Sequence, residues 1–308
     1  IISWLLIICG FGYGLSKGKD NMMGVDFAGG YSMVMKFDQT ELSKLDEAVT
    51  GGMREVIGEK AGIDASQVQA QLQPDLASGD RLLRVDFPLS DSGQDNAKGV
   101  EEALNSTYGE ANFERLQLDK VGPSVSDEIQ KSAAIAVMLA LFGILVYVAF
   151  RYEYSFAIGA VIAILHDVAM TGGWFFLSGR ELNAPIVAAA LTIIGFSIND
   201  TIVIFDRIRE NLRMGSRGSF ADVMNKSINQ TLSRTIITSG TTLLSTATLY
   251  FFGGTVINDF AFTFLVGVIV GTYSSIYIAC YIVLKWHKGK RPELAAPTTD
   301  IDPVPAVT

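Results

Sequence analysis

A carboxylate inside a membrane-length apolar run has the clearest chemical meaning in this sequence. Asp200 lies within the run from Ala184 to Phe205, APIVAAALTIIGFSINDTIVIF. A charge near the middle of a membrane helix costs about 2.5–3.5 kcal/mol on insertion scales, so it is not expected to face lipid. We therefore expect Asp200 either to form a structural contact with neighbouring helices or to exchange a proton as those helices move.

An arginine and a series of hydroxyl groups open the next apolar run. Arg234 precedes Thr235–Phe252, and Thr238, Thr241 and Ser245 follow it at three- and four-residue spacing. Hydroxyls at this spacing either let helices pack closely or line a wet path, and the sequence leaves both open. The arginine is either an interfacial side chain or the cation that pairs with the buried carboxylate of the preceding run.

Three more polar residues inside apolar runs complete the candidate proton-coupling site. Asn199 precedes Asp200 and is expected to hold that carboxylate, or a neighbouring helix, by hydrogen bonding. His166 and Asp167 lie in the middle of another run. Because adjacent residues point to different faces of a helix, we expect each to find a partner on another helix and not to form a mutual relay. Helix packing and proton handling are both open for this pair, and a metal site is not expected because the other histidine, His287, follows the last run.

Glycines predict where helices approach one another. Gly267 and Gly271 form a G-x-x-x-G pattern in the last apolar run, which is typical of a helix contact. Gly195 lies one turn before Asn199 and is expected to let another helix come close to the Asn199-Asp200 site.

These residues need a membrane bundle to position them. Of the 308 residues 49% are hydrophobic, and about 20 apolar residues cross the hydrocarbon core of a bilayer. We expect Ile1–Leu15 to be a first span cut at its cytoplasmic end. A secretory signal peptide is the alternative, although no basic leader or small-x-small cleavage site precedes Lys17. We therefore predict an α-helical integral membrane protein with a six-span bundle, whose other spans are Ser132–Phe150, Tyr154–Leu177, Ala184–Phe205, Thr235–Phe252 and Phe260–Leu284.

The distribution of Lys and Arg predicts the orientation of the bundle, because short cytoplasmic loops retain these residues. The short loops on the opposite side, Ser178–Asn183 and Gly253–Asp259, contain only Arg180. We expect both termini in the cytoplasm and residues 17–130 outside it. The basic residues assigned to the cytoplasmic side are Arg151, Arg207, Arg209, Arg213, Arg217, Lys226, Arg234, Lys285, Lys288, Lys290 and Arg291.

The acidic segment between the first two spans reads as a water-exposed domain. Its order of elements, β-α-β-β-α-β, is typical of a ferredoxin-like α+β sandwich. It has no histidine or cysteine, so binding or mechanical transmission is favoured over catalysis. We divide the chain into residues 1–16 (truncated first span), 17–130 (extracytoplasmic domain), 131–285 (five-span bundle) and 286–308 (disordered, proline-rich cytoplasmic tail). The expected elements are strands at Tyr31–Phe37, Gln67–Leu72, Arg81–Phe87 and Asn112–Leu118, helices at Glu41–Glu59 and Asn96–Tyr108, and a turn at Pro74–Asp80.

Several function classes are disfavoured. The G-x-G-x-G pattern at 10–14 lies inside a span, and Gly18-Lys19 lacks the upstream glycine of a phosphate loop. Cys9 and Cys280 fall in apolar runs, so neither a disulfide framework nor a cysteine metal site is predicted. We predict no enzyme activity, catalytic residue, metal, cofactor or nucleic-acid partner, and we favour an ion gradient over ATP as the source of energy.

Motifs spread over nearly the whole chain carry a family resemblance. They are GVDFAGG at 24–30, VGPSV at 121–125, His166-Asp167, GFSINDTIV at 195–203 continuing to DRIREN at 206–211, QTLSRTI at 230–236 and TSGTT at 238–242. Together, and in this order, they resemble the SecF branch of the SecD/SecF family. This family comprises membrane subunits of the bacterial Sec protein-export machinery that are related to resistance-nodulation-division transporters. The main departure is a longer soluble domain, around 57–67 and 90–96.

The resemblance implies a role, a location and partners. It implies that the chain pairs with SecD, as a separate subunit or a fused chain, in the bacterial inner membrane. It further implies work with the SecYEG channel, a YajC-type accessory subunit and the translocating preprotein, driven by the proton-motive force. In the family, the positions of Asp200 and Arg234 belong to the proton-transport region, while the carboxylate most closely tied to proton transfer belongs to SecD. A proton-driven small-molecule or lipid exporter and a passive channel scaffold are the alternatives.

Overall fold

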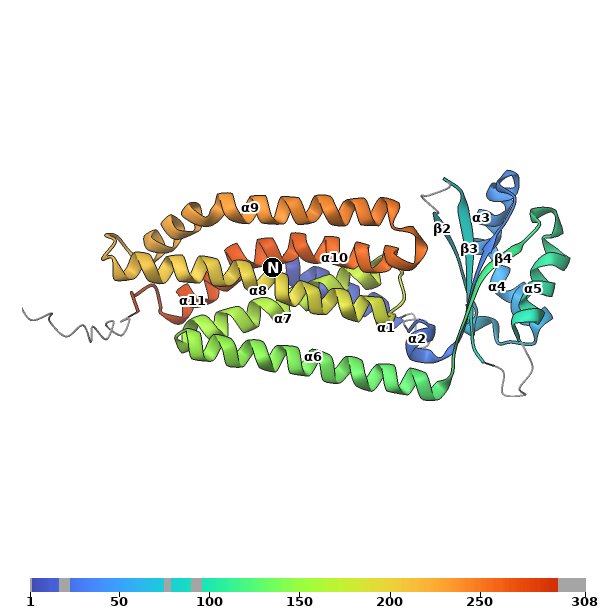
Figure 1. The fold of residues 1–308 in the computed structure, drawn as a ribbon, viewed down its shortest axis with the longest axis horizontal. Helices are drawn as coiled ribbons and strands as arrows, with labels where there is room; N and C mark the ends of the chain where they lie inside the picture. The colour runs from blue at the N-terminus through green and yellow to red at the C-terminus, as the bar shows by residue number, and fades with distance from the viewer. Residues whose placement is uncertain (1, 17–22, 75–78, 90–95, 293–308) are drawn as a thin grey trace, which may run out of the picture.

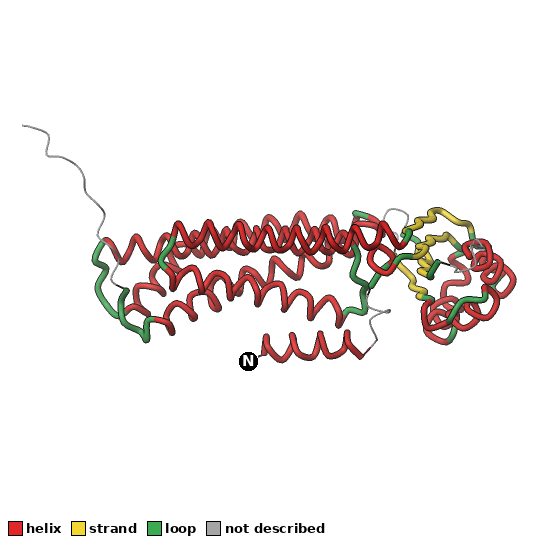
Figure 2. Tube along the Cα trace, turned by 90° about the horizontal axis from the view of Figure 1, so that it is seen from below, coloured by secondary structure: helices red, strands yellow, loops and turns green. Residues whose placement is uncertain are grey.

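The molecule has two parts, a long helical bundle and, at one end of it, a smaller sheet covered by helices (Figures 1 and 2). The structure is a computed structural model that describes residues 2–16, 23–74, 79–89 and 96–292. Most of the turn expected at 74–80 and most of the tail expected at 286–308 lie outside the described residues. The chain is mostly helical, as the apolar runs predicted.

The sheet has four antiparallel strands in the order β2-β3-β1-β4. Successive side chains of a strand point to opposite faces, and one face packs against the helices of this part. The buried core on that face includes Met33, Met35, Leu83 and Val85. The strands are β1 Gly30–Lys36, β2 Gln69–Pro74, β3 Arg81–Phe87 and β4 Glu114–Val121, and the helices are α3 Leu42–Gly51, α4 Met53–Ala61 and α5 Asn96–Thr107.

The first predicted helix of the sheet domain is in fact two helices. The sequence pattern predicted one helix over Glu41–Glu59, but α3 ends at Gly51 and α4 begins at Met53. Gly52 between them has a φ of 134°, a conformation that residues with a side chain rarely adopt. The chain changes direction at this glycine, and the two helices cover the sheet separately.

Four helical stretches among the described residues are long and apolar enough to cross a membrane. α1 (Ile2–Ser16) is apolar but has only 15 residues. α9 (Phe220–Phe252), which contains the predicted span Thr235–Phe252, runs beside α8 and α10 but is not among the four (Figure 1). The four are α6 Pro123–Arg151, α7 Tyr154–Leu177, α8 Ala184–Arg213, and the stretch Ile257–Trp286, which contains most of α10 Gly254–Ser274, a π turn at Ser275–Ala279, and α11 Cys280–Trp286.

The G-x-x-x-G pattern of the last stretch lies against α8, as predicted. A Cβ atom added at Gly267 would lie 2.2 Å from Ile193 Cδ1, and one added at Gly271 would lie 3.2 Å from Ser197 Cβ. A side chain at Gly267 would require Ile193 to shift, and one at Gly271 would press against Ser197, so the two helices approach closely here. The same expectation for Gly195 was wrong within this chain, because no heavy atom lies within 4 Å of the Cβ position there.

The sheet domain is tied to the bundle by a short segment before β1. The Gly24 N–H donates to the Leu182 carbonyl oxygen at 2.8 Å, and the Ala184 N–H donates to Asp26 Oδ2 at 2.9 Å. Asp26 belongs to α2 (Val25–Ala28), a helix that the sequence pattern did not predict. Its carboxylate satisfies a free N–H group in the first turn of α8. The contact connects the sheet domain directly to the start of that helix.

The Asp26→Ala variant is expected to lower the free energy of unfolding by about 0.5–2 kcal/mol, because the first turn of α8 loses a hydrogen-bond acceptor. Denaturant titration of the purified chain in detergent, followed by tryptophan fluorescence, measures this loss. Asp127→Ala removes an exposed carboxylate and is the matched control, expected to change stability by less than about 0.5 kcal/mol. Equal losses in the two variants would contradict the proposed capping role.

Candidate proton-coupling site

A buried polar cluster joins α7 and α8 in the centre of the bundle. Asp167 Oδ1 lies 3.2 Å from His166 Nδ1, and Ser197 Oγ donates to Asp167 Oδ2 at 2.5 Å. The side chains of His166 and Asp167 are each only 1% exposed. Both carboxylate oxygens of Asp167 therefore have a partner, as buried polar groups require.

The sequence predicted that His166 and Asp167 form no mutual relay and that each finds a partner on another helix. Asp167 does have such a partner in Ser197, but the two side chains also contact each other, which the prediction excluded. Neighbouring residues leave a helix about 100° apart, but the imidazole and the carboxylate lean along the helix surface until they meet. Burial is the physical reason, because neither group can bond to bulk water and each takes the polar partner within reach. His166 Nε2 has no hydrogen-bond partner among the described residues, and the Trp4 ring lies edge-on to the imidazole at a centroid distance of 6.1 Å.

Hydroxyl groups extend this cluster to the π turn that follows α10. Thr201 Oγ1 donates to Ser275 Oγ at 2.9 Å, and Ser275 Oγ donates to the Ser197 carbonyl oxygen at 3.1 Å. Ser275 begins the π turn, an irregularity that is frequent at functional sites. The sequence pattern did not single out these hydroxyls. The available signal was that Ser197 and Thr201 lie four residues apart on either side of Asp200 in an otherwise apolar run.

Asp200 lies on α8 one turn beyond Ser197 and is only 3% exposed. Its Oδ2 atom has no hydrogen-bond partner among the described residues. An ionised carboxylate in such surroundings is strongly unfavourable unless it is paired. The described part of the chain therefore provides no hydrogen-bond partner for Oδ2 of Asp200. A bound proton or a group from another chain would satisfy this oxygen.

Neither Arg234 nor Asn199 bonds to Asp200 in this structure, although the charge of Arg234 lies near enough to act on Asp200. For Arg234 the sequence had left an interfacial position open as the alternative, whereas Asn199 was expected to form a hydrogen bond. Among the described residues, the side chain of Arg234 forms neither an ion pair nor a hydrogen bond. The side chain of Asn199 forms no hydrogen bond with them either. Both residues are exposed, whereas Asp200 is buried. Asn199 is displaced from Asp200 by about 100° around the helix axis, which turns it towards the outside of the bundle.

The hydroxyl groups that follow Arg234 bond to their own helix. Thr238 Oγ1 donates to the Arg234 carbonyl oxygen, Thr241 Oγ1 to that of Ile237 at 2.9 Å, and Ser245 Oγ to that of Thr241 at 3.0 Å. Such bonds to the preceding turn satisfy a hydroxyl inside an apolar environment. These hydrogen bonds link no second helix to α9. Neither of the two predicted uses of these hydroxyl groups, close helix packing or a wet path, is therefore visible in these contacts.

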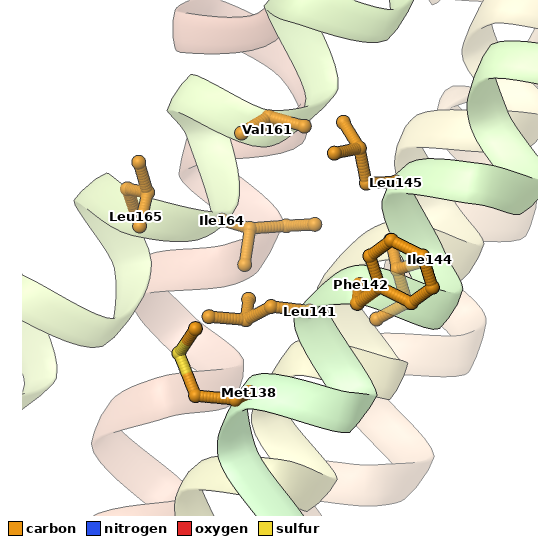
Figure 3. A pocket seen from close by; sticks show the side chains of 8 residues that line it. All are labelled: Met138, Leu141, Phe142, Ile144, Leu145, Val161, Ile164 and Leu165. Atoms are coloured by element: carbon orange, nitrogen blue, oxygen red, sulfur yellow. The ribbon is translucent and has the colours of Figure 1, made fainter. Parts of the chain in front are cut away.

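An apolar cavity of about 240 Å³ lies between α6 and α7 (Figure 3). A site that selects a small molecule normally combines apolar walls with a few polar groups, and this cavity is lined only by hydrocarbon and thioether side chains. The walls of this cavity therefore offer apolar contact only. The lining residues are Met138, Leu141, Phe142, Ile144, Leu145, Val161, Ile164 and Leu165. In the described part of the chain no group of three or more His, Cys, Asp or Glu side chains could hold a metal ion.

The sequence profile of a known family matches most of this chain. The family is described as "Protein export membrane protein SecD/SecF, C-terminal", and the match covers residues 100–289. The matched region includes most of α5, β4 and the helices from α6 to α11. All five candidate residues, His166, Asp167, Asn199, Asp200 and Arg234, lie within it.

Individual relatives agree with this match. The protein translocase subunit SecF of Desulfurispirillum indicum is 41% identical over 271 residues, which cover 86% of this chain and 82% of the relative. That of Calditerrivibrio nitroreducens is 41% identical over 290 residues, 92% of this chain and 89% of the relative. The crystal structure of SecDF from Thermus thermophilus, a translocon-associated membrane protein, matches with a TM-score of 0.76 and 36% identity over 93% of this chain and 37% of its own. This chain therefore belongs to the SecD/SecF family of protein-export membrane proteins.

Proposed function

We propose that this chain, a SecF-like protein-export subunit, acts with SecD to use the proton-motive force for preprotein translocation and release across the bacterial inner membrane. The observation that carries the proposal is Asp200, a buried carboxylate in a membrane-length helix with an oxygen that the described residues do not satisfy. Intramembrane carboxylates of this kind mark proton relays. Family membership supplies the transport context.

In the proposed mechanism, proton binding changes the charge at Asp200 and thereby the packing of α8 against its neighbours. α8 contacts α10 through Ile193 and Gly267 and contacts α7 through Ser197 and Asp167. A change in the position of α8 would reach the sheet domain, because the first turn of α8 is bonded to α2. The charge of Arg234 acts on Asp200 without an ion pair, and a movement of α9 would bring the two groups into direct contact.

SecD is the proposed partner for an exposed face of the bundle. The four exposed residues Ala188, Thr192, Gly195 and Asn199 follow one another along one side of α8, and the exposed Arg234 lies on α9. Small and polar residues at membrane depth favour contact with another helix over contact with lipid. The SecDF of Thermus thermophilus is 37% identical to this chain, which matches only 38% of its length. The rest of such a fused chain would supply the partner half.

The proposed topology has six spans, with α1 and α9 added to the four apolar stretches. α1 packs on α7, where the rings of Phe11 and Phe176 have centroids 5.4 Å apart. We propose that both termini lie in the cytoplasm and residues 17–130 outside it; the position of the basic loops at the end of the bundle remote from the sheet supports this orientation. The order of strands and helices supports a ferredoxin-like fold for the sheet domain.

Reconstitution tests the proposal. The chain is combined with a SecD partner and the SecYEG channel in vesicles free of other SecD and SecF, and completed preprotein transport is measured with and without a proton gradient. A YajC-type subunit is added in a parallel sample. We expect the gradient to increase transport only when this chain and SecD are both present. An assembled complex without a gradient response would overturn proton coupling and leave a passive scaffold. Gradient-driven release of a small molecule without any effect on preproteins would instead support an exporter.

A further inference from the structure

The sheet domain meets the bundle through a polar junction. The sheet stands between its own helices and the end of the bundle (Figure 1). Arg84 and Asp86 lie on the face of β3 opposite the hydrophobic core, and β-pairing places Gln69 of β2 beside Asp86. On the bundle side, the loop between α7 and α8 contributes Glu181, and α10 contributes Asp259.

Three carboxylates are buried at this junction, and two of them form ion pairs with arginines. Asp86, Glu181 and Asp259 are 7%, 8% and 8% exposed. Arg84 Nε lies 2.9 Å from Asp86 Oδ2, and Arg180 forms an ion pair with Asp259. Among the described residues Glu181 forms no ion pair, and its Oε1 atom has no hydrogen-bond partner. Among the described residues, Glu181 is therefore the one of these three acids without a directly paired arginine when all three are ionised.

Glu181 borders a small polar cavity. The cavity has a volume of about 160 Å³ and lies between the sheet, α2 and the loop that carries Glu181. Gln67, Gln69 and Asp86 line it together with Glu181. A polar cavity of this size admits water, since one water molecule occupies about 30 Å³ in the liquid. Water gives the unpartnered carboxyl a route for taking up and releasing a proton.

The surroundings of Glu181 favour its neutral form. Burial, Asp86 and Asp259 together raise the pKa of Glu181 to about 8, against the opposing effects of Arg84 and Arg54. An exposed glutamate has a pKa near 4.5. Between about pH 4.5 and pH 8, Glu181 therefore keeps its proton when the sheet domain is docked and releases it when the domain is separated. Docking is then strongest below about pH 4.5, weakens as the pH rises, and reaches its weakest level above about pH 8, where the docked form is ionised too.

We propose that Glu181 is a proton-binding site at the sheet end of the bundle, and that the bound proton keeps the sheet domain docked on α8 and α10. Release of the proton leaves a third carboxylate charge beside Asp86 and Asp259, whose arginines are already engaged, and the junction loosens. The site is separate from Asp200 and outside the membrane-length helices. The proposal goes beyond the proposed function and does not depend on it, because docking is measurable in this chain alone.

Infrared difference spectroscopy tests the proton itself. The full chain in lipid nanodiscs is titrated from about pH 5 to about pH 10, a range that covers both protonation states of Glu181. We expect a carbonyl stretching band of a buried protonated carboxyl that disappears with a midpoint near pH 8, is absent in Glu181→Gln and persists in Glu102→Gln, the control at an exposed acid of α5. A Glu181→Gln spectrum identical to the wild type would overturn the proposal.

A distance measurement tests docking. Spin labels are placed at the exposed positions Asn105 on α5 and Thr248 on α9, after replacement of the exposed Cys9. In the wild type we expect one narrow distance at low pH and a second population at higher pH. The ratio of the second population to the first is expected to increase by at most about tenfold per pH unit, because one proton is released. Glu181→Gln is expected to keep the narrow distance throughout. The same pH response in that variant, or no response in the wild type, would overturn the proposal.

Two further measurements distinguish a proton from a sodium ion and relate the proton to the neighbouring charges. Sodium is exchanged for N-methylglucamine at constant pH, and docking that follows sodium in place of pH would identify a cation site and overturn the proton site. Asp86→Asn removes a neighbouring negative charge and frees Arg84, so we expect it to shift the titration midpoint of the Glu181 band to lower pH. This second variant keeps the test valid if Glu181→Gln fails to fold, and an unchanged midpoint in it would contradict the proposal.

Discussion

Asp200→Asn is expected to remove the gradient-dependent part of preprotein transport while the complex with SecD stays assembled. Asparagine preserves the size of the side chain but cannot take up or release a proton. Coupling free energies between sites typically correspond to about 5- to 150-fold, so we expect the ratio of completed transport with and without a gradient to fall by a factor in this range. Reconstituted vesicles with protease-protected preprotein as the readout provide the measurement.

The stability of this variant separates chemistry from folding. Because Asp200 is buried with an unsatisfied oxygen, removal of its charge is not expected to lower the free energy of unfolding. Asp127→Asn makes the same chemical change at an exposed position and is the control for transport. A fully retained gradient response in assembled Asp200→Asn would place proton coupling elsewhere, and an assembly defect would indicate a structural role.

Gly267→Val is expected to destabilise the bundle by about 1–3 kcal/mol, the usual cost of overpacking a tight contact. A Cβ atom at this position would lie 2.2 Å from Ile193 Cδ1 and 2.3 Å from Ile193 Cγ1, so the Ile193 side chain would have to shift or α8 and α10 would have to separate. Since α8 also carries Asp200, the variant is expected to impair transport as well. Unfolding of the purified chain in detergent, followed by tryptophan fluorescence, measures the loss.

Two variants make this prediction specific. Gly195→Val adds the same side chain at a helix position with no heavy atom within 4 Å of the new Cβ, so it should leave the stability of the isolated chain unchanged. Ile193→Ala removes the atoms that clash, and the double variant with Gly267→Val is expected to be more stable than the sum of the two single losses implies. Additive losses would show that the α8–α10 contact is not the cause.

The local elements of this fold were largely predictable. β3 and α7 have the predicted bounds Arg81–Phe87 and Tyr154–Leu177, because apolar and polar residues alternate from Leu83 to Phe87 and a long apolar run favours a helix. The break at Gly52 was not predicted, since the hydrophobic spacing continues through it and only the positive φ reveals the turn. α9 is longer than the apolar run within it, because a helix can continue into water where its polar turns are exposed.

The identity of the candidate residues was predictable, but their partners were not. An apolar run makes Asp200 conspicuous wherever it packs, and Arg234 stands out because it opens the next apolar run ahead of a series of hydroxyl groups. No pattern along the chain indicated that Ser197 would bond to Asp167, which lies 30 residues earlier. The same holds for the three acids of the junction, which come from β3, the α7–α8 loop and α10.

The sequence by itself determined the membrane class of this protein, the positions of its long apolar helices, the existence of a separate sheet domain, its family and which ionisable residues lie inside the apolar helices. These properties depend on the composition of short segments and on the free energy of transferring each segment between water and apolar surroundings. That free energy is a property of the segment itself and does not depend on its partners. Only the tertiary structure decided that His166 contacts Asp167, that Arg234 is exposed and forms no ion pair with Asp200, and that Glu181 is the junction acid without an ion pair among the described residues. Hydrogen bonds and ion pairs act over a few ångströms between segments distant in the chain, so they exist only once packing has chosen which faces meet.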